Sequence, residues 1–141
     1  MPKQLYNFST PYNPEDLFDL IADIESYPKF LPWVMAARIL SHKDKILIAE
    51  LAIKYKIFRS CYTSKVTLIP KQEIIVELVE GPFKYLHNYW RFIKEADGSK
   101  IEFMLDFELR SSILEELISS ELDRYAKKLM EAFIKRAAEI Y

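Results

Sequence analysis

The chain is poor in glycine and cysteine and carries almost no net charge. Only two of its 141 residues are glycine, while half are hydrophobic and 14% are aromatic. Such a composition excludes a disordered or low-complexity chain and predicts a compact core. The single cysteine, Cys61, excludes an intramolecular disulfide, which is typical of a reducing compartment or of a fold that needs no crosslink. With 20 basic and 21 acidic residues, the chain has no overall field that would attract nucleic acid or an anionic membrane.

Long apolar runs are also missing. Charged residues interrupt every apolar stretch well before the roughly 18 residues that a membrane span needs. Residues 1–8 lack both the apolar segment of a secretion signal and the Arg- and Ser-rich character of an import sequence. We therefore expect a cytoplasmic protein, in which any membrane contact is peripheral and on the inner face of the membrane. The length suits one domain over residues 1–141.

The motifs of common catalytic and metal chemistry are absent from the sequence. His42 and His87 lie far apart and without a cysteine cluster, so we expect no metal site. Without a glycine-rich phosphate loop, a G-x-S-x-G motif or a Cys/His dyad, we expect no catalytic residue and no catalytic cofactor. Asp106 and Glu108 share a strand face with Glu102 and are candidates for an acid–base pair. Because that face lies opposite the apolar one, a solvated role is the simpler interpretation.

The first third of the chain contains a strand, a helix and an unusual aromatic segment. A short strand is expected over residues 3–9, and a helix follows with Asn13 as its N-cap and Pro14 at its first position. Residues 27–33 read Tyr-Pro-Lys-Phe-Leu-Pro-Trp. Its two prolines exclude a regular long helix and predict a short turn that exposes aromatic side chains.

Residues 35–110 are predicted to form a meander of about six antiparallel strands. Segments rich in β-branched and aromatic residues alternate there with turn signals at residues 41–44, 70–72 and 97–98, and with a kink at residues 81–83. The clearest alternation runs over residues 101–109, where apolar positions alternate with charged ones.

The remainder of the chain predicts one long amphipathic helix over residues 112–141. Ser112 and Glu115 form a capping box at its start, and apolar positions recur every three or four residues. At about 42 Å, this helix exceeds the radius of gyration of about 14 Å expected for the domain, so it must lie across the sheet. The predicted fold class is α+β, with a curved antiparallel sheet of about seven strands wrapped around a long C-terminal helix.

A strongly twisted sheet that bends around one helix leaves a space that side chains either fill or leave open. The predicted inward-facing set is almost purely apolar, which suits burial of hydrocarbon better than a polar reaction. It consists of Trp90, Phe92, Phe103, Leu105, Phe107, Leu117, Tyr125 and Phe133. Each CH₂ group moved there from water contributes about 0.8 kcal/mol, so a few isoprene or acyl units would support micromolar binding. A solid core without a ligand explains the same pattern, and periodicity alone favours it.

Three stretches of the chain resemble a known family. They are residues 27–33, then Glu-Gly-Pro-Phe-Lys-Tyr-Leu at 80–86 with Trp-Arg-Phe at 90–92, and Leu-Asp-Phe-Glu-Leu at 105–109 with Met-Glu-Ala-Phe at 130–133 and Arg-Ala at 136–137. In this order, and across nearly the whole chain, they are similar to the coenzyme Q-binding protein and ribosome association toxin family of the START, or polyketide cyclase, superfamily. The resemblance implies a helix-grip fold and a START-like lipid-binding domain.

The resemblance also implies two different functions. One is non-catalytic binding of a polyprenyl quinone, ubiquinone, in the cavity, in support of respiratory electron transport. The other, in the bacterial branch, is binding to the large ribosomal subunit that blocks subunit joining, with an antitoxin as a further partner. Many bacterial relatives have cysteine after the Pro-Trp pair, whereas Val34 stands there in this chain, so any role of that thiol is absent. A cyclase or hydratase on the same fold is a third hypothesis, and it requires polar residues in the cavity.

The candidate ligand-binding residues belong to the cavity and to residues 27–33, which we expect to form a lip at its mouth. They are Phe30, Leu31, Trp33, Phe83, Leu86, Trp90, Phe92, Phe103, Leu105, Phe107, Leu117 and Tyr125. A rigid plug is the alternative to the lip, and a simple bend between strands is the alternative to ligand contact at Phe83. Basic residues on the strands are candidates for contacts with ribosomal RNA, although a charged outer sheet face is the simpler account. These are Lys54, Lys56, Arg59, Lys65, Lys84 and Arg91.

Overall fold

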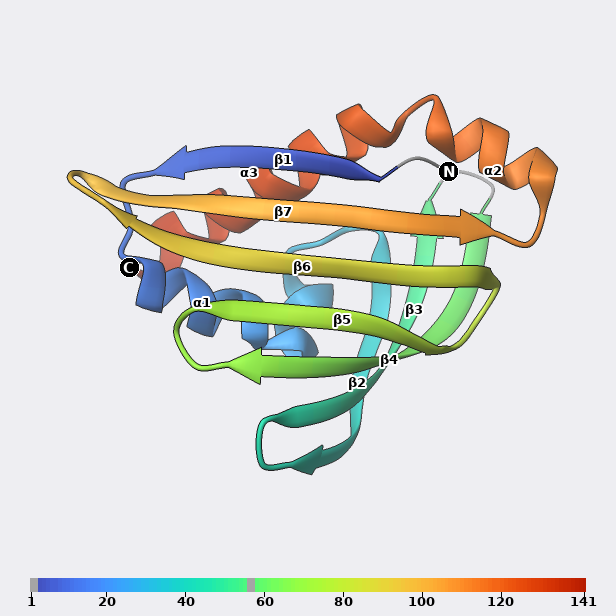
Figure 1. Cartoon of the computed structure of the whole chain (residues 1–141), viewed down its shortest axis with the longest axis horizontal. Helices are drawn as coiled ribbons and strands as arrows, with labels where there is room; N and C mark the ends of the chain where they lie inside the picture. The colour runs from blue at the N-terminus through green and yellow to red at the C-terminus, as the bar shows by residue number, and fades with distance from the viewer. Residues whose placement is uncertain (1–2, 56–57) are drawn as a thin grey trace.

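The computed structural model describes residues 3–55 and 58–141. Strand β1 and helix α1 come first, followed by a 3-10 helix, η1, six strands in succession and two helices (Figure 1). Their bounds are β1 Gln4–Thr10, α1 Pro14–Ala22, η1 Ile24–Lys29, β2 Val34–Lys43, β3 Ile46–Tyr55, β4 Phe58–Ile69, β5 Glu73–Glu80, β6 Phe83–Glu95, β7 Gly98–Leu109, α2 Ser112–Ser119 and α3 Leu122–Ile140.

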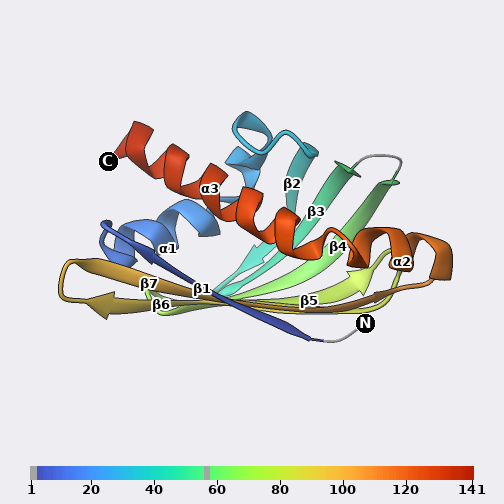
Figure 2. The ribbon, with the colours of Figure 1, turned by 90° about the horizontal axis from the view of Figure 1, so that it is seen from above.

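The seven strands form one antiparallel sheet in the order β1-β7-β6-β5-β4-β3-β2. Strands β2 to β7 are a meander, as predicted, and β1 adds to the far edge by pairing with β7. The sheet curves strongly, so that β5, β6 and β7 run across the view of Figure 1 while β2, β3 and β4 turn away from them. Helix α3 lies across the concave side (Figure 2). This arrangement confirms the predicted helix-grip fold.

Local chemistry explains the start of α1, while the turn after β2 is shorter than predicted. The side chain of Asn13 accepts a hydrogen bond from the Glu15 amide at 3.0 Å, and Pro14 opens α1, both as predicted. The turn between β2 and β3 lies at Asp44 and Lys45, so that residues 41–43, which were predicted as part of a turn, end β2 instead.

Gly98 is required at the hairpin between β6 and β7. Its φ of +144° is a conformation that side chains with a Cβ rarely adopt, and a Cβ placed there would lie 2.0 Å from the carbonyl oxygen of Thr10. The hairpin predicted from residues 97–98 therefore also allows β7 to approach the end of β1 closely.

The predicted single C-terminal helix is two helices, and that part of the prediction is wrong. The Ser120 hydroxyl donates to the carbonyl of Leu117 at 2.9 Å, which competes with the regular backbone pattern. The Glu121 amide then donates to Ile118 at 3.0 Å, three residues back rather than four. The chain therefore tightens at residues 120–121 before α3 begins.

The start of α2 also differs from the predicted capping box. Ser111, rather than Ser112, is the N-cap, and its hydroxyl accepts from the Leu114 amide at 3.3 Å. The carboxylate of Glu115 accepts from the amide of Leu109 at 2.7 Å, so it ties the end of β7 to the helix instead of closing a capping box.

Helix α3 is attached to the sheet by aromatic packing and by a hydrogen bond from β1. The ring of Phe133 lies 5.5 Å from those of Tyr27, Phe30 and Trp90, which come from both the aromatic segment and β6. Nearer the start of the helix, the Tyr6 hydroxyl on β1 donates to Asp123 at 2.7 Å. The helix is thus held to strands at the middle and at the edge of the sheet.

Candidate functional site

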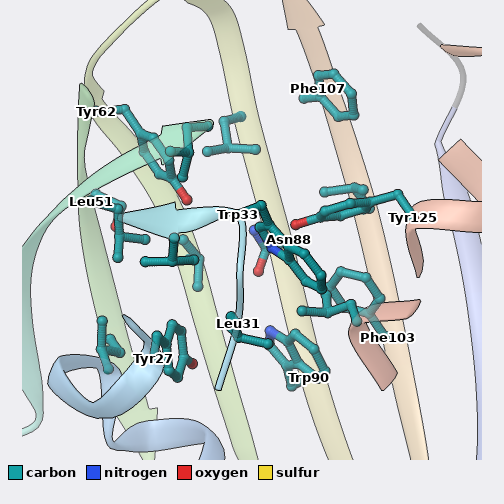
Figure 3. Close-up of a pocket in the computed structure, with 18 of the residues that line it drawn as sticks. Tyr27, Leu31, Trp33, Leu51, Tyr62, Asn88, Trp90, Phe103, Phe107 and Tyr125 are labelled. Carbon is teal, nitrogen blue, oxygen red and sulfur yellow. The ribbon is translucent and has the colours of Figure 1, made fainter. Parts of the chain in front are cut away.

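A cavity of about 190 Å³ lies between the concave face of the sheet and α3. Inward-facing side chains of strands β3 to β7 form most of its walls, and α1, η1, the segment after it, the start of β2, α2 and α3 complete them (Figure 3). The core is therefore not solid. The period of two along each strand explains why alternate residues reach this space while their neighbours face the opposite side of the sheet.

Aromatic rings form much of the wall. Trp90 and Phe103, which are paired across β6 and β7, stack with their centroids 4.2 Å apart. Phe83 meets Phe107 edge-on at 5.9 Å and Tyr62 at 5.6 Å. Flat rings held in this way form rigid walls that suit a flat or elongated apolar molecule.

Three polar side chains converge in the cavity from different elements. Tyr62 lies on β4, Asn88 on β6 and Tyr125 on α3. In Figure 3 the two hydroxyls and the amide point into the same space, with the Tyr125 hydroxyl directed toward Asn88. Within the described ranges, the Asn88 Oδ1 atom is buried and has no hydrogen-bond partner. Burial, with a smaller contribution from Tyr125, raises the pKa of the Tyr62 hydroxyl, so this group is a protonated donor at neutral pH.

Tyr27 also borders the cavity, but its hydroxyl has a structural partner. It donates to the carbonyl of Ile21 at the end of α1. Burial, followed by the influence of Tyr62, Asp23 and Tyr125, raises the pKa of Tyr27 well above its ordinary value. The neutral hydroxyl therefore fixes η1 against α1.

Most of the residues predicted to bind ligand line the cavity. These are Leu31, Trp33, Phe83, Leu86, Trp90, Phe103, Leu105, Phe107 and Tyr125. The structure therefore brings together residues that span more than ninety positions of the chain. Their contact with a ligand stays a prediction.

Phe30, Phe92 and Leu117 do not line this cavity. The predicted place of Phe92 and Leu117 in its wall is wrong, whereas Phe30 was predicted in the lip, and its contact with a ligand stays a prediction. Phe92 is on the inward face of β6, but α1 covers this end of the sheet and Phe18 packs edge-on against the ring at 5.8 Å. Phe30 lies between the ring of Phe133 and the guanidinium of Arg136, each at 5.5 Å. Leu117 is 42% exposed, and its neighbour Ile118 lines the cavity in its place.

The segment predicted as a lip forms one border of the cavity. Leu31 is fully buried, while Trp33 is half-buried and meets the Tyr125 ring of α3 at a centroid distance of 5.6 Å. The carbonyl of Trp33 accepts from the Lys54 amide at 2.8 Å, which fixes this segment to β3. Trp33 and Tyr125 thus close the space between the sheet and the helix, and movement of the lip stays a prediction.

The outer face of the sheet is charged and partly self-neutralised. Arg91 contacts Glu73 at 3.2 Å and Glu102 at 3.3 Å, and Lys84 contacts Glu108 at 3.5 Å. The acidic residues of β7 therefore lie opposite the cavity, as predicted. Of the predicted basic group, Lys56 lies outside the described residues.

The described part of the chain was searched for metal-binding clusters and for membrane-spanning helices. No group of three His, Cys, Asp or Glu residues there is arranged to hold a metal ion. None of its helices is long and apolar enough to cross a membrane.

Comparison with known proteins places this chain in a family. Residues 10–134 match the family model for polyketide cyclase / dehydrase and lipid transport. The chain belongs to this family. It is 41% identical over 134 residues to the ribosome association toxin RatA of Rickettsia prowazekii (strain Madrid E), covering 92% of each chain. It is 30% identical over 132 residues to the mitochondrial coenzyme Q-binding protein COQ10 homolog B of Xenopus laevis, covering 90% of this chain and 54% of that protein. These matches confirm the resemblance inferred from the three stretches.

A solved structure shares the fold of this chain. The Zhui aromatase/cyclase from Streptomyces sp. R1128 superposes with a TM-score of 0.88, covering 97% of this chain and 93% of that one. At 15% identity this likeness concerns the fold alone. The two relatives are named a ribosome association toxin and a coenzyme Q-binding protein, and the family model is named for polyketide cyclase / dehydrase and lipid transport.

The polar lining is the feature that the sequence-based prediction missed. An almost purely apolar wall was expected, but Tyr62, Ser64 and Asn88 all line the cavity. The sequence held a signal at Asn88, because it shares the inward phase of β6 with Leu86 and Trp90. A polar residue on an apolar strand face marks either a hydrogen-bonded core position or a ligand contact. The cyclase hypothesis required polar residues in the cavity, and the lining contains them.

Proposed function

We propose that this protein binds the ring and the first isoprenoid units of a polyprenyl quinone, ubiquinone, in the cavity and acts as a non-catalytic carrier that supports respiratory electron transport. The observation that carries the proposal is the combination of aromatic walls with the three convergent polar groups, Tyr62, Asn88 and Tyr125. A quinone ring is flat and apolar on its faces and carries oxygens at its edge. The wall and the polar groups are complementary to these two properties.

The size of the cavity limits how much of the ligand it encloses. Its volume of about 190 Å³ is below the roughly 300–1,000 Å³ of pockets that enclose drug-sized ligands. We therefore place the ring and a short part of the tail inside. Ile118 of α2 lines the cavity, and Ile113 and Leu117 of the same helix are 75% and 42% exposed. These side chains offer an apolar surface to the tail as it leaves, where each buried CH₂ contributes about 0.8 kcal/mol.

Extraction and titration test the proposal independently. Protein purified from a quinone-producing host is extracted with organic solvent, and the extract is analysed by mass spectrometry. In parallel, a ubiquinone with two isoprenoid units is titrated into the protein. The chain has two tryptophans, Trp33 and Trp90, and both line the cavity. We expect co-purified quinone and saturable quenching of tryptophan fluorescence.

Adjacent residues of β4 provide a matched pair of variants. Ser64 is 2% exposed and lines the cavity, whereas Thr63 faces the other side of the sheet. Ser64→Leu should fill part of the space and weaken binding about tenfold or more, and Thr63→Leu should leave it unchanged. Absence of lipid in the extract together with absence of quenching would contradict quinone binding.

Ribosome association is the second candidate function, and two observations favour it. The first is the 41% identity to the Rickettsia protein named a ribosome association toxin. The second is a like-charge pair on the outer sheet face, where Lys54 on β3 is directly opposite Arg59 on β4. Such a pair disfavours the sheet, and an anionic partner such as RNA phosphate would relieve the repulsion.

Sedimentation tests the second candidate. Protein that acts on the ribosome should cosediment with the large subunit at low salt and increase the proportion of free subunits. A Lys54→Ser, Arg59→Ser variant should lose cosedimentation, while a Lys84→Ser variant, whose parent residue contacts Glu108, serves as the charge control. If the wild-type protein neither cosediments nor changes the subunit ratio, this candidate is excluded.

A further inference from the structure

Asn88 presents a buried hydrogen-bond acceptor to the cavity. Its Oδ1 atom has no hydrogen-bond partner within the described ranges, although the residue lies in the middle of β6 between inward-facing Leu86 and Trp90. Buried polar side-chain atoms in native proteins nearly always have a partner, and an unpaired acceptor is unfavourable. Its position in the wall of a cavity indicates that the missing partner is a bound molecule.

The chemistry of the acceptor restricts that molecule. An amide oxygen needs a donor, and a neutral phenolic or hydroquinone hydroxyl can provide one. The oxidised quinone has only carbonyl oxygens at its ring edge, and these accept hydrogen bonds but donate none. The reduced ring carries hydroxyls, each of which donates one hydrogen bond and accepts another.

A donor to the oxygen of a ring hydroxyl is also present in the cavity. The Tyr62 hydroxyl points into the same space as the Asn88 amide (Figure 3). It can donate to the oxygen of a ring hydroxyl while that hydroxyl donates to Asn88 Oδ1. A quinone carbonyl would accept the hydrogen bond from Tyr62. It has no hydrogen to donate to Asn88 Oδ1, so that second hydrogen bond would not form.

We infer that the cavity prefers the reduced, hydroquinone form of the ring to the oxidised quinone, with Asn88 Oδ1 accepting a hydrogen bond from a ring hydroxyl. The inference rests on the proposed quinone binding and adds the redox state of the ligand. A tenfold preference for the reduced form corresponds to a rise of about 30 mV in the midpoint potential of the bound two-electron couple. A carrier with this preference would hold its cargo as the quinol.

Calorimetric titration under anaerobic conditions tests the preference directly. The probes are the two-isoprenoid ubiquinone and its quinol, which differ only in ring oxidation state. We expect the wild-type protein to bind the quinol about tenfold more tightly. The Asn88→Leu variant should lose this preference, so that its affinities for the quinol and for the quinone become equal. Asn7→Leu is the matched control, because Asn7 is exposed on the opposite face of the sheet.

The outcomes separate this inference from the proposed function. Equal affinities in the wild-type protein, or tighter binding of the quinone, would overturn the inference and leave quinone binding intact. A preference that persists in Asn88→Leu would overturn the role of Asn88. Binding of neither probe would overturn the proposed function and the inference together. The wild-type comparison needs no variant, so it decides the preference even if Asn88→Leu does not fold.

Discussion

Asn88 should reduce the stability of the protein that carries it. Its buried Oδ1 is unpaired among the described residues, and the side chain borders space that a larger apolar group could enter. We predict that Asn88→Leu raises the free energy of unfolding by about 1–3 kcal/mol, because it removes the unpaired acceptor and buries additional apolar surface. Urea denaturation followed by far-UV circular dichroism measures the change. Asn7→Leu should stay within about 0.5 kcal/mol of the wild type, and a lower stability of Asn88→Leu would show that the amide has a structural partner.

The alternation of apolar and polar residues predicted which face of the sheet most side chains lie on, but not which residues they pack against. Phe103, Leu105 and Phe107 face the cavity as their alternation indicated. Phe92 has the same inward phase, yet α1 lies over it, and this coverage depends on how distant elements pack. The prediction missed Asn88 because it was built on the apolar residues of β6, and Asn88 is a polar residue in the same phase.

Attachment of α3 to the sheet depends on Phe133. This side chain is 1% exposed and contacts rings from η1, from the segment after it and from β6. We predict that Phe133→Ala lowers the free energy of unfolding by about 3–5 kcal/mol, because it leaves a void where the helix meets the sheet. Phe133→Leu should cost less, at about 1.5 kcal/mol or below. Ile140→Ala, at a position that is 50% exposed in the last turn of α3, is the control for loss of an apolar group. Chemical denaturation of the three variants provides the measurement, and equal effects of Phe133→Ala and Ile140→Ala would contradict this role.

The break between α2 and α3 shows what periodicity cannot predict. Apolar positions continue at spacings of three and four through residues 112–141, and neither glycine nor proline interrupts them. The interruption comes from a serine hydroxyl that bonds to the backbone of the preceding turn, an interaction too weak to be decisive from sequence. Of these two neighbouring side chains of α2, Ile118 lines the cavity and Leu117 does not.

At the scale of the whole molecule, the meander was predictable and the pairing of the first strand with the last was not. Consecutive strands leave a local signal in the turns that join them. The pairing of β1 with β7 joins Gln4 to Leu105 and has no such signal, because no turn connects these strands. The cavity is likewise a product of the complete fold, since its volume depends on how the curved sheet, α1 and α3 pack together. The sequence predicted its walls, and the ligand inside stays a proposal.

Partly buried tyrosines in these walls should make the stability of the whole molecule sensitive to alkaline pH. Burial raises the pKa of Tyr62 above its ordinary value of 10.0, so above about pH 10 the unfolded chain loses this proton while the folded protein retains it. The unfolded state then binds fewer protons, and the free energy of unfolding falls as the pH rises, by up to about 1.4 kcal/mol per pH unit from this residue. Below about pH 10 the group contributes no pH dependence, because both states are protonated. Urea denaturation of the wild type and of Tyr62→Phe at pH values from about 8 to 11.5 isolates the effect. The difference in stability between the two proteins should be constant up to about pH 10 and then shift steadily in favour of Tyr62→Phe. Parallel curves over the whole range would show that the Tyr62 hydroxyl is not buried in solution.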